Sequence, residues 1–181
     1  IENYRELREK LAAAGTTFVT DTDTETVALL AHHYMQNGME PVDAAKKTLE
    51  ELDGAYALCF LFEGEQDLLV AARKGSPLAI GHGDGEAFVG SDAIALAPLT
   101  DKITYLEEGD CAVVTRESVV ITDAQGKLAN REMRVVQIDS TRVDKAGHKH
   151  FMAKEIAEQP GVIGDALQHY LSTDGLDVKI D

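Results

Sequence analysis

The sequence has no tryptophan, four prolines, two cysteines and a shortage of basic side chains. Its 17 Lys and Arg stand against 32 Asp and Glu, giving a formal net charge of −15. This charge excludes nucleic acid and an anionic membrane surface as partners, since both attract basic patches. No apolar run approaches the ~20 residues that cross a bilayer. With 44% hydrophobic residues, the 181-residue chain can still bury a core.

The two cysteines, Cys59 and Cys111, lie inside apolar, strand-like segments. Such a placement predicts buried free thiols, which are typical of proteins in the reducing cytoplasm. We therefore expect a cytoplasmic protein without disulfides.

Neither end of the sequence looks like the natural end of a protein. The chain begins IENYRELREKL, without Met or a signal peptide, and ends STDGLDVKID. Tyr4, Leu7 and Leu11 already form an apolar helix face close to the first residue. The sequence is therefore expected to be a piece of a longer protein.

Helical periodicity dominates the first part of the chain. Gly15 is a candidate helix end and Pro41 a candidate first-turn residue. The segments of this part are predicted as helices over 2–14, 24–36 and 41–52, with a short strand at 16–20. Near the end of the chain, a further helix is expected to begin near His150 and to be interrupted at Pro160.

The pattern changes to short β-rich runs after residue 54. Glycines separate these runs, and MRVVQI is predicted as the last strand. GHGDG at 81–85 lacks the spacing of a phosphate-binding loop and is predicted to be a hairpin loop. Helices followed by consecutive strands predict α+β layers rather than an alternating, doubly wound sheet.

Three carboxylates lie within five residues in TDTDTE, from Asp21 through Asp23 to Glu25. A calcium loop of the EF-hand type needs Gly at its sixth position and Glu at its twelfth. Counted from Asp21, those positions hold Thr26 and His32. No metal site is predicted here.

Capping of the helix that follows is the simplest role for this cluster. Asp23 or Thr24 could accept from first-turn N–H groups, while Glu25 complements the positive helix end. A carboxylate that faces a pocket and binds a cationic ligand is the alternative, and chemistry alone leaves both open. His148 and His150 lack further His or Cys ligands nearby, so they predict no metal site either.

Seven segments along the chain form an ordered series of motifs: IENYRELREKL, GTTFVTDTDTE, LDGAYAL, AARKGSPLAIG, GSDAIAL, YLEEGD and HFMAKEIAEQP. Together they resemble the family of glutamine–fructose-6-phosphate aminotransferase (isomerizing), or glucosamine-6-phosphate synthase, over nearly the whole chain. The first six are shared more loosely with other amidotransferases. The last resembles the junction into the sugar-isomerase half and is specific to the aminosugar branch.

The resemblance implies an N-terminal-nucleophile (Ntn) hydrolase fold, a four-layer αββα sandwich, here without its early strands. In this family an N-terminal Cys attacks the glutamine side-chain amide, its α-amino group acts as base, and an Asn-Gly pair forms the oxyanion hole. The ammonia is transferred to fructose 6-phosphate, giving glucosamine 6-phosphate and glutamate. No cofactor is implied.

Carried over residue by residue, the resemblance assigns one substrate-binding residue. Asp23 matches the carboxylate that binds the α-ammonium of the substrate glutamine. In the family the oxyanion pair directly precedes IIEN, so it lies just outside this chain together with the nucleophile and the Arg-rich segment that holds the glutamine carboxylate. Cys59 and Cys111 match no nucleophile position. No catalytic residue is therefore expected within the chain, which is predicted to be inactive alone.

The resemblance also divides the chain. Residues 1–138 correspond to the later part of the glutaminase domain, 139–149 to a linker, and 150–181 to the start of the sugar-isomerase region. Homodimers or other homo-oligomers are implied for the whole enzyme. Two alternatives remain: a non-catalytic glutamine-sensing or interaction module with the same fold, and another amidotransferase of the superfamily.

Overall fold

The computed structural model describes residues 1–136 and 145–171. The chain divides into two compact units, Ile1–Ile138 and Asp139–Asp181. Most of the predicted linker at 139–149 lies outside the described residues, so the linker stays a prediction. None of the helices in the described part of the chain is both long and apolar enough to cross a membrane.

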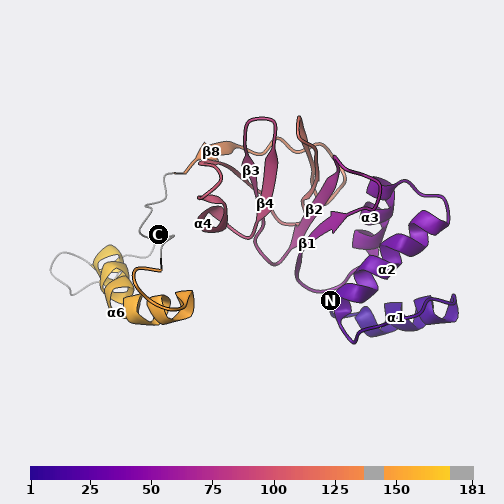
Figure 1. Ribbon diagram of the computed structural model, residues 1–181, viewed down its shortest axis with the longest axis horizontal. Coiled ribbons are helices and arrows are strands. Elements are labelled where there is room, and N and C mark those ends of the chain that lie inside the picture. Colours follow the sequence, from indigo (N-terminus) through magenta and orange to yellow (C-terminus); the bar gives the residue numbers. More distant parts are fainter. Residues whose placement is uncertain (137–144, 172–181) are drawn as a thin grey trace. The chain divides into compact units, whose positions relative to one another are not determined.

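Three helices open the first unit (Figure 1). They are α1 (Tyr4–Ala13), α2 (Asp23–Gln36) and α3 (Pro41–Glu51), close to the predicted ranges. Gly15 follows the C-cap of α1 with φ of 91°, a left-handed conformation that favours glycine at helix ends. Pro41 occupies the first turn of α3, where its missing N–H costs nothing.

Two four-stranded antiparallel sheets complete the first unit. Their strand orders are β1-β2-β6-β7 and β4-β3-β5-β8. The predicted hairpin between β3 and β4 is confirmed, although Gly81 and His82 belong to β3 and the loop itself spans 83–86. The strands are β1 (Tyr56–Leu61), β2 (Leu69–Lys74), β3 (Ala79–His82), β4 (Ala87–Gly90), β5 (Lys102–Tyr105), β6 (Cys111–Val114), β7 (Val119–Thr122) and β8 (Met133–Val135).

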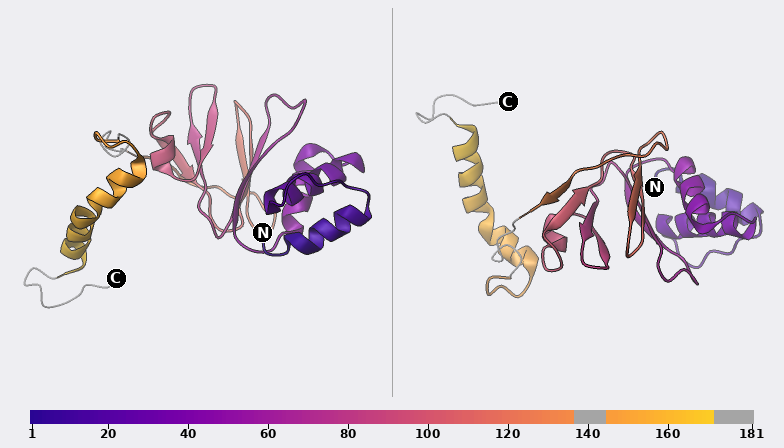
Figure 2. Two further views of the ribbon diagram at one scale, coloured as in Figure 1. Left: turned by 60° about the horizontal axis from the view of Figure 1, so that its bottom comes forward. Right: turned by 90° about the horizontal axis from the view of Figure 1, so that it is seen from above.

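These elements form layers, with the helices on one side of the first sheet and the second sheet on its other side (Figures 1 and 2). Alternation along β2 explains the arrangement, because Val70 and Ala72 join a core beneath the helices while Ala71 joins the core between the sheets. A short helix, α4 (Ala93–Leu96), covers the other face of the second sheet around Ile103. The α+β expectation is thus confirmed, although α4 was not predicted.

The second unit contains α6 (Phe151–Tyr170), a helix of 20 residues. The predicted interruption at Pro160 is wrong, because the helix is continuous through it. Proline removes one N–H donor and crowds the preceding turn, but the turns on both sides retain their own hydrogen bonds.

Two further sequence predictions fail in the first unit. Residues 16–20 form no strand, because side chains rather than a neighbouring strand bind their backbone, as described below. Cys59 is exposed although Cys111 is buried as predicted. β1 is an edge strand whose alternate residues face the helices, and Cys59 belongs to the other set.

Candidate functional site

The first turn of α2 is the place where the sequence predicts function. Thr22 is the N-cap, with extended backbone and a side-chain oxygen that accepts a hydrogen bond from the Glu25 N–H at 3.3 Å. The prediction that Asp23 or Thr24 caps the helix is therefore wrong. Asp23 is the first helical residue instead, and its carboxylate is not needed for the cap.

Asp23 lies at the positive end of the helix with its carboxylate accessible. The side chain is 41% exposed, and Oδ2 accepts a hydrogen bond from the α-ammonium of Ile1 at 2.5 Å. The Thr24 hydroxyl approaches Oδ1 at 3.4 Å. The bond from the ammonium is the main cause that lowers the pKa of Asp23 below its usual range. The carboxylate is thus accessible at the positive end of the helix, and in a chain that extends before Ile1 a peptide N–H would replace this ammonium.

Glu25, two residues further on, has a different environment. Its side chain is 13% exposed. The carboxylate accepts hydrogen bonds from the Val19 N–H at 2.7 Å, the Thr20 N–H at 2.8 Å and the Thr20 hydroxyl at 2.7 Å. The first of these is the largest cause that lowers the pKa of Glu25. Its donors all come from the protein's own backbone and side chains, which makes Glu25 a structural carboxylate.

Asp21, the third carboxylate of the cluster, is exposed. The sequence reasoning missed the structural role of Glu25, although a signal was present. Thr22 and Glu25 have the T-x-x-E spacing of a capping box, in which the Glu reaches back toward the backbone before the helix.

Neither cysteine of the chain is set up as a nucleophile. Cys111 is buried, and burial raises the pKa of its thiol. Desolvation also raises the pKa of Cys59, even though part of that residue is exposed. A raised pKa keeps a thiol protonated near neutral pH, whereas the thiolate is the reactive form.

A cavity of about 530 Å³ lies between α2 and β1. Its wall is mainly apolar, with Val27 and Met35 from the helix and Leu58 and Phe60 from the strand. Thr24 lies at its edge, one residue beyond Asp23. Such a lining suits apolar packing and offers few partners to the polar groups of an amino acid.

The fold and this helix start define the class: an α+β domain with two stacked antiparallel sheets and an accessible carboxylate at the start of a helix. The family model described as "Glutamine amidotransferase domain" matches residues 1–98, more than half of the chain. The chain belongs to the glutamine amidotransferase domain family.

Curated relatives are more specific. The chain is 56% identical to a glutamine–fructose-6-phosphate aminotransferase [isomerizing] of Bradyrhizobium diazoefficiens, 53% to one of Mesorhizobium japonicum and 52% to one of Agrobacterium fabrum. Each match covers 94% of this chain and 28% of the relative. The chain therefore spans less than a third of the length of these relatives.

Proposed function

We propose that this chain is part of a glutamine-dependent aminotransferase that makes glucosamine 6-phosphate and glutamate from glutamine and fructose 6-phosphate. Within that enzyme it contributes the carboxylate that binds the α-ammonium of glutamine. The observation that carries the proposal is the placement of Asp23: its carboxylate is 41% exposed at the positive start of α2, and Oδ2 lies 2.5 Å from the backbone nitrogen of Ile1. An accessible carboxylate in this position can accept charge-assisted hydrogen bonds from the α-ammonium of a bound amino acid.

The relation between Asp23 and Ile1 also supports the rest of the site. By the resemblance, the Asn-Gly pair that stabilises the oxyanion lies just before this chain. The contact between Ile1 and Asp23 would therefore bring the oxyanion pair and the ammonium-binding carboxylate to one place. That is the arrangement needed to hold glutamine by its amino end near the reacting amide.

The remaining groups of the reaction belong to other parts of the enzyme. An N-terminal Cys ahead of this chain would attack the glutamine amide, with its own amino group as base. The released ammonia would then pass to fructose 6-phosphate in a sugar-isomerase region that begins at residues 150–181, beyond a linker at 139–149. The match covers 28% of the relative's length, which supports the proposal that other parts of the enzyme carry these groups.

The layers of the first unit are compatible with an Ntn-hydrolase sandwich that lacks its early strands. Helices cover one sheet, α4 covers the other, and a shared core joins the sheets. The strands ahead of Ile1 would complete the αββα arrangement. We further propose that the complete enzyme is cytoplasmic, in keeping with the two free thiols of this chain, and forms a homodimer or other homo-oligomer.

The test is an Asp23→Asn substitution in the longer protein that carries this chain. A charge-assisted bond contributes about 1.5–3 kcal/mol, so the glutamine KM should rise about 10- to 150-fold. The unfolding free energy should change by less than ~1 kcal/mol, because Thr22 is the cap and only the helix-end charge is lost. Ammonia release from glutamine and thermal unfolding measure the two effects.

Asp21→Asn is the matched control, since Asp21 is exposed in the same cluster and should affect neither quantity. The chain alone should release no ammonia from glutamine, because it lacks the nucleophile. An unchanged glutamine KM in Asp23→Asn would defeat the proposed role of this carboxylate.

A further inference from the structure

The segment before α2 is held by side chains instead of a sheet. The backbone N–H groups of Val19 and Thr20 both donate to Glu25, so two donors that a strand partner would normally take are satisfied by one carboxylate. The Thr20 hydroxyl adds a third bond to Glu25 and lies 2.9 Å from the hydroxyl of Thr22, the helix cap. Glu25 thereby ties the approaching backbone to the first turn of α2.

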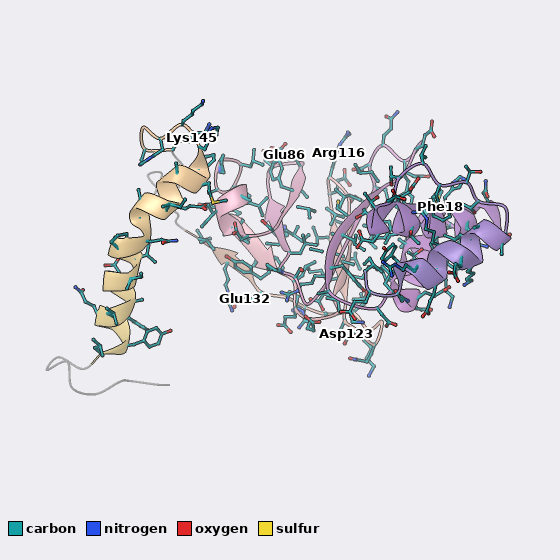
Figure 3. All side chains as sticks on the ribbon, turned by 90° about the horizontal axis from the view of Figure 1, so that it is seen from below. Phe18, Glu86, Arg116, Asp123, Glu132 and Lys145 are labelled. Carbon is teal, nitrogen blue, oxygen red and sulfur yellow. The ribbon has the colours of Figure 1, made fainter. Side chains whose placement is uncertain are left out.

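Arg8 of α1 fixes the same segment from a second helix. Its Nη2 donates to the Thr20 carbonyl at 2.7 Å, and its guanidinium lies over the Phe18 ring at 4.1 Å from the centroid. Nη1 approaches the Glu25 carboxylate at 3.9 Å. Figure 3 shows Phe18 among the helices of the first unit. The carbonyl and both neighbouring N–H groups of the segment are thus bound by side chains.

The direction in which the Asp23 carboxylate points depends on this arrangement. Within the described residues, its carboxylate accepts from the Ile1 ammonium and from the adjacent Thr24, and no distant side chain orients it. The backbone at Thr22 and Asp23 therefore decides where the carboxylate points. A carboxylate that must meet a ligand ammonium needs such a fixed backbone, because small displacements weaken binding.

We propose that Glu25 and Arg8 are positioning residues that hold the segment 18–22 and so aim Asp23 at the ammonium of its ligand. The proposal rests on the proposed function of Asp23 and adds the support on which ligand affinity depends. In this proposal both residues act through the backbone of segment 18–22 and not through a contact with the ligand. Loss of either should weaken ligand binding through displacement of Asp23.

Glu25→Gln is the primary test, made in the longer protein that carries this chain. Glutamine has one side-chain oxygen, and its NH2 group cannot accept from the second backbone N–H. The glutamine KM should rise about tenfold while kcat changes little. Glu50→Gln is the matched control, because Glu50 is 65% exposed and pairs only with Lys47 on its own helix among the interactions described.

Substitutions at two further positions, Thr20 and Arg8, keep the test decisive if Glu25→Gln does not fold. Thr20→Val removes the hydroxyl donor but retains the backbone N–H, so it should raise KM by a smaller factor. Arg8→Lys retains a donor for the Thr20 carbonyl, whereas Arg8→Met does not. Glutamine KM should therefore be closer to the parent value in Arg8→Lys than in Arg8→Met. A purely structural role would lower the melting temperature in these variants without separating their KM values.

The outcomes separate this inference from the proposed function. An Asp23→Asn variant that binds glutamine normally would defeat the proposed function itself. If Asp23→Asn loses affinity but the Glu25 and Arg8 variants keep the parent KM, only the positioning role is overturned. Raised KM in both groups supports both, and backbone amide NMR should then show displaced Val19 and Thr20 signals in Glu25→Gln.

Discussion

Two corners of the first unit each contain an aspartate, and the two side chains have opposite environments: one is buried and the other is partly exposed. Asp110 has a fully buried side chain that accepts from the Glu107 N–H at 2.7 Å and from two nitrogens of Arg131 at 2.8 Å each. Asp23, at the start of α2, is 41% exposed and binds one ammonium. The first corner is closed by the protein's own donors, whereas the second is open to solvent.

This difference gives a physical criterion for separating structural from functional carboxylates. A buried carboxylate is tolerated when fixed donors satisfy both of its oxygens, as at Asp110 and, at the helix start, at Glu25. A ligand-binding carboxylate must keep an oxygen within reach of a molecule from solution. Sequence position alone does not distinguish the two, since Asp23 and Glu25 are only two residues apart.

The largest effect on stability is expected at the closed corner. Asp110→Asn removes the charge that pairs with Arg131, and it offers an NH2 group where the guanidinium donates. Breaking a buried ion pair costs about 3–5 kcal/mol, and Arg131 retains Glu107 as a partner, so we expect the lower end of this range. Denaturant unfolding measures the loss.

Glu107→Gln is the control for this corner. Glu107 is 66% exposed, and exposed ion pairs contribute about 0–1 kcal/mol. Equal losses of unfolding free energy in Asp110→Asn and Glu107→Gln would contradict the contrast between a buried and an exposed carboxylate.

A smaller effect is expected from the cap of α2. Thr22→Ala should reduce the unfolding free energy by about 1 kcal/mol, because it removes the oxygen that accepts the Glu25 N–H. Thr24→Ala, inside the first turn, should change it by less than ~0.5 kcal/mol. Thermal unfolding of the two variants checks the assignment. A larger loss of unfolding free energy in Thr24→Ala than in Thr22→Ala would show that Thr24 is the cap.

The smallest expected effect is the dependence of stability on pH through Asp23. In the chain that begins at Ile1, the ammonium of that residue lowers the pKa of Asp23, so the bond stabilises the fold above the usual carboxyl pKa. That contribution is lost as the pH falls from the usual pKa through the lowered one. Carbon-13 NMR titration of the Asp23 carboxyl should show the lowered pKa.

Acetylation of Ile1 provides the control, since it removes the α-ammonium while leaving the side chains intact. The pKa of Asp23 should then rise toward its usual value. An Asp23 pKa that does not respond to acetylation would show that another group lowers it.

Much of the fold follows from local patterns in the sequence. The apolar period locates the three opening helices, and glycine-separated β runs locate the strands and the GHGDG hairpin. The failures occur where distant contacts decide. Residues 16–20 look like a strand but bind Arg8 and Glu25, and Cys59 looks buried but lies on the uncovered face of an edge strand. The helix through Pro160 shows that a local penalty need not end a helix.

The candidate site was less accessible to pattern reasoning. Chemistry alone left Asp23 between a cap and a ligand-binding group, and only the resemblance to a family selected it. The structure removes the capping role by giving it to Thr22. The support from Arg8 could not be predicted, because a contact between α1 and the segment before α2 depends on how the helices pack.

The central claim is that Asp23 recognises an α-ammonium, and the most direct measurement varies the ligand and the residue together. L-glutamate and glutarate differ only in that ammonium, so their inhibition constants should be compared in the longer protein and in its Asp23→Asn variant. The parent should prefer L-glutamate by about 10- to 150-fold, and Asp23→Asn should lose most of that preference. An equal preference in both proteins would contradict the account.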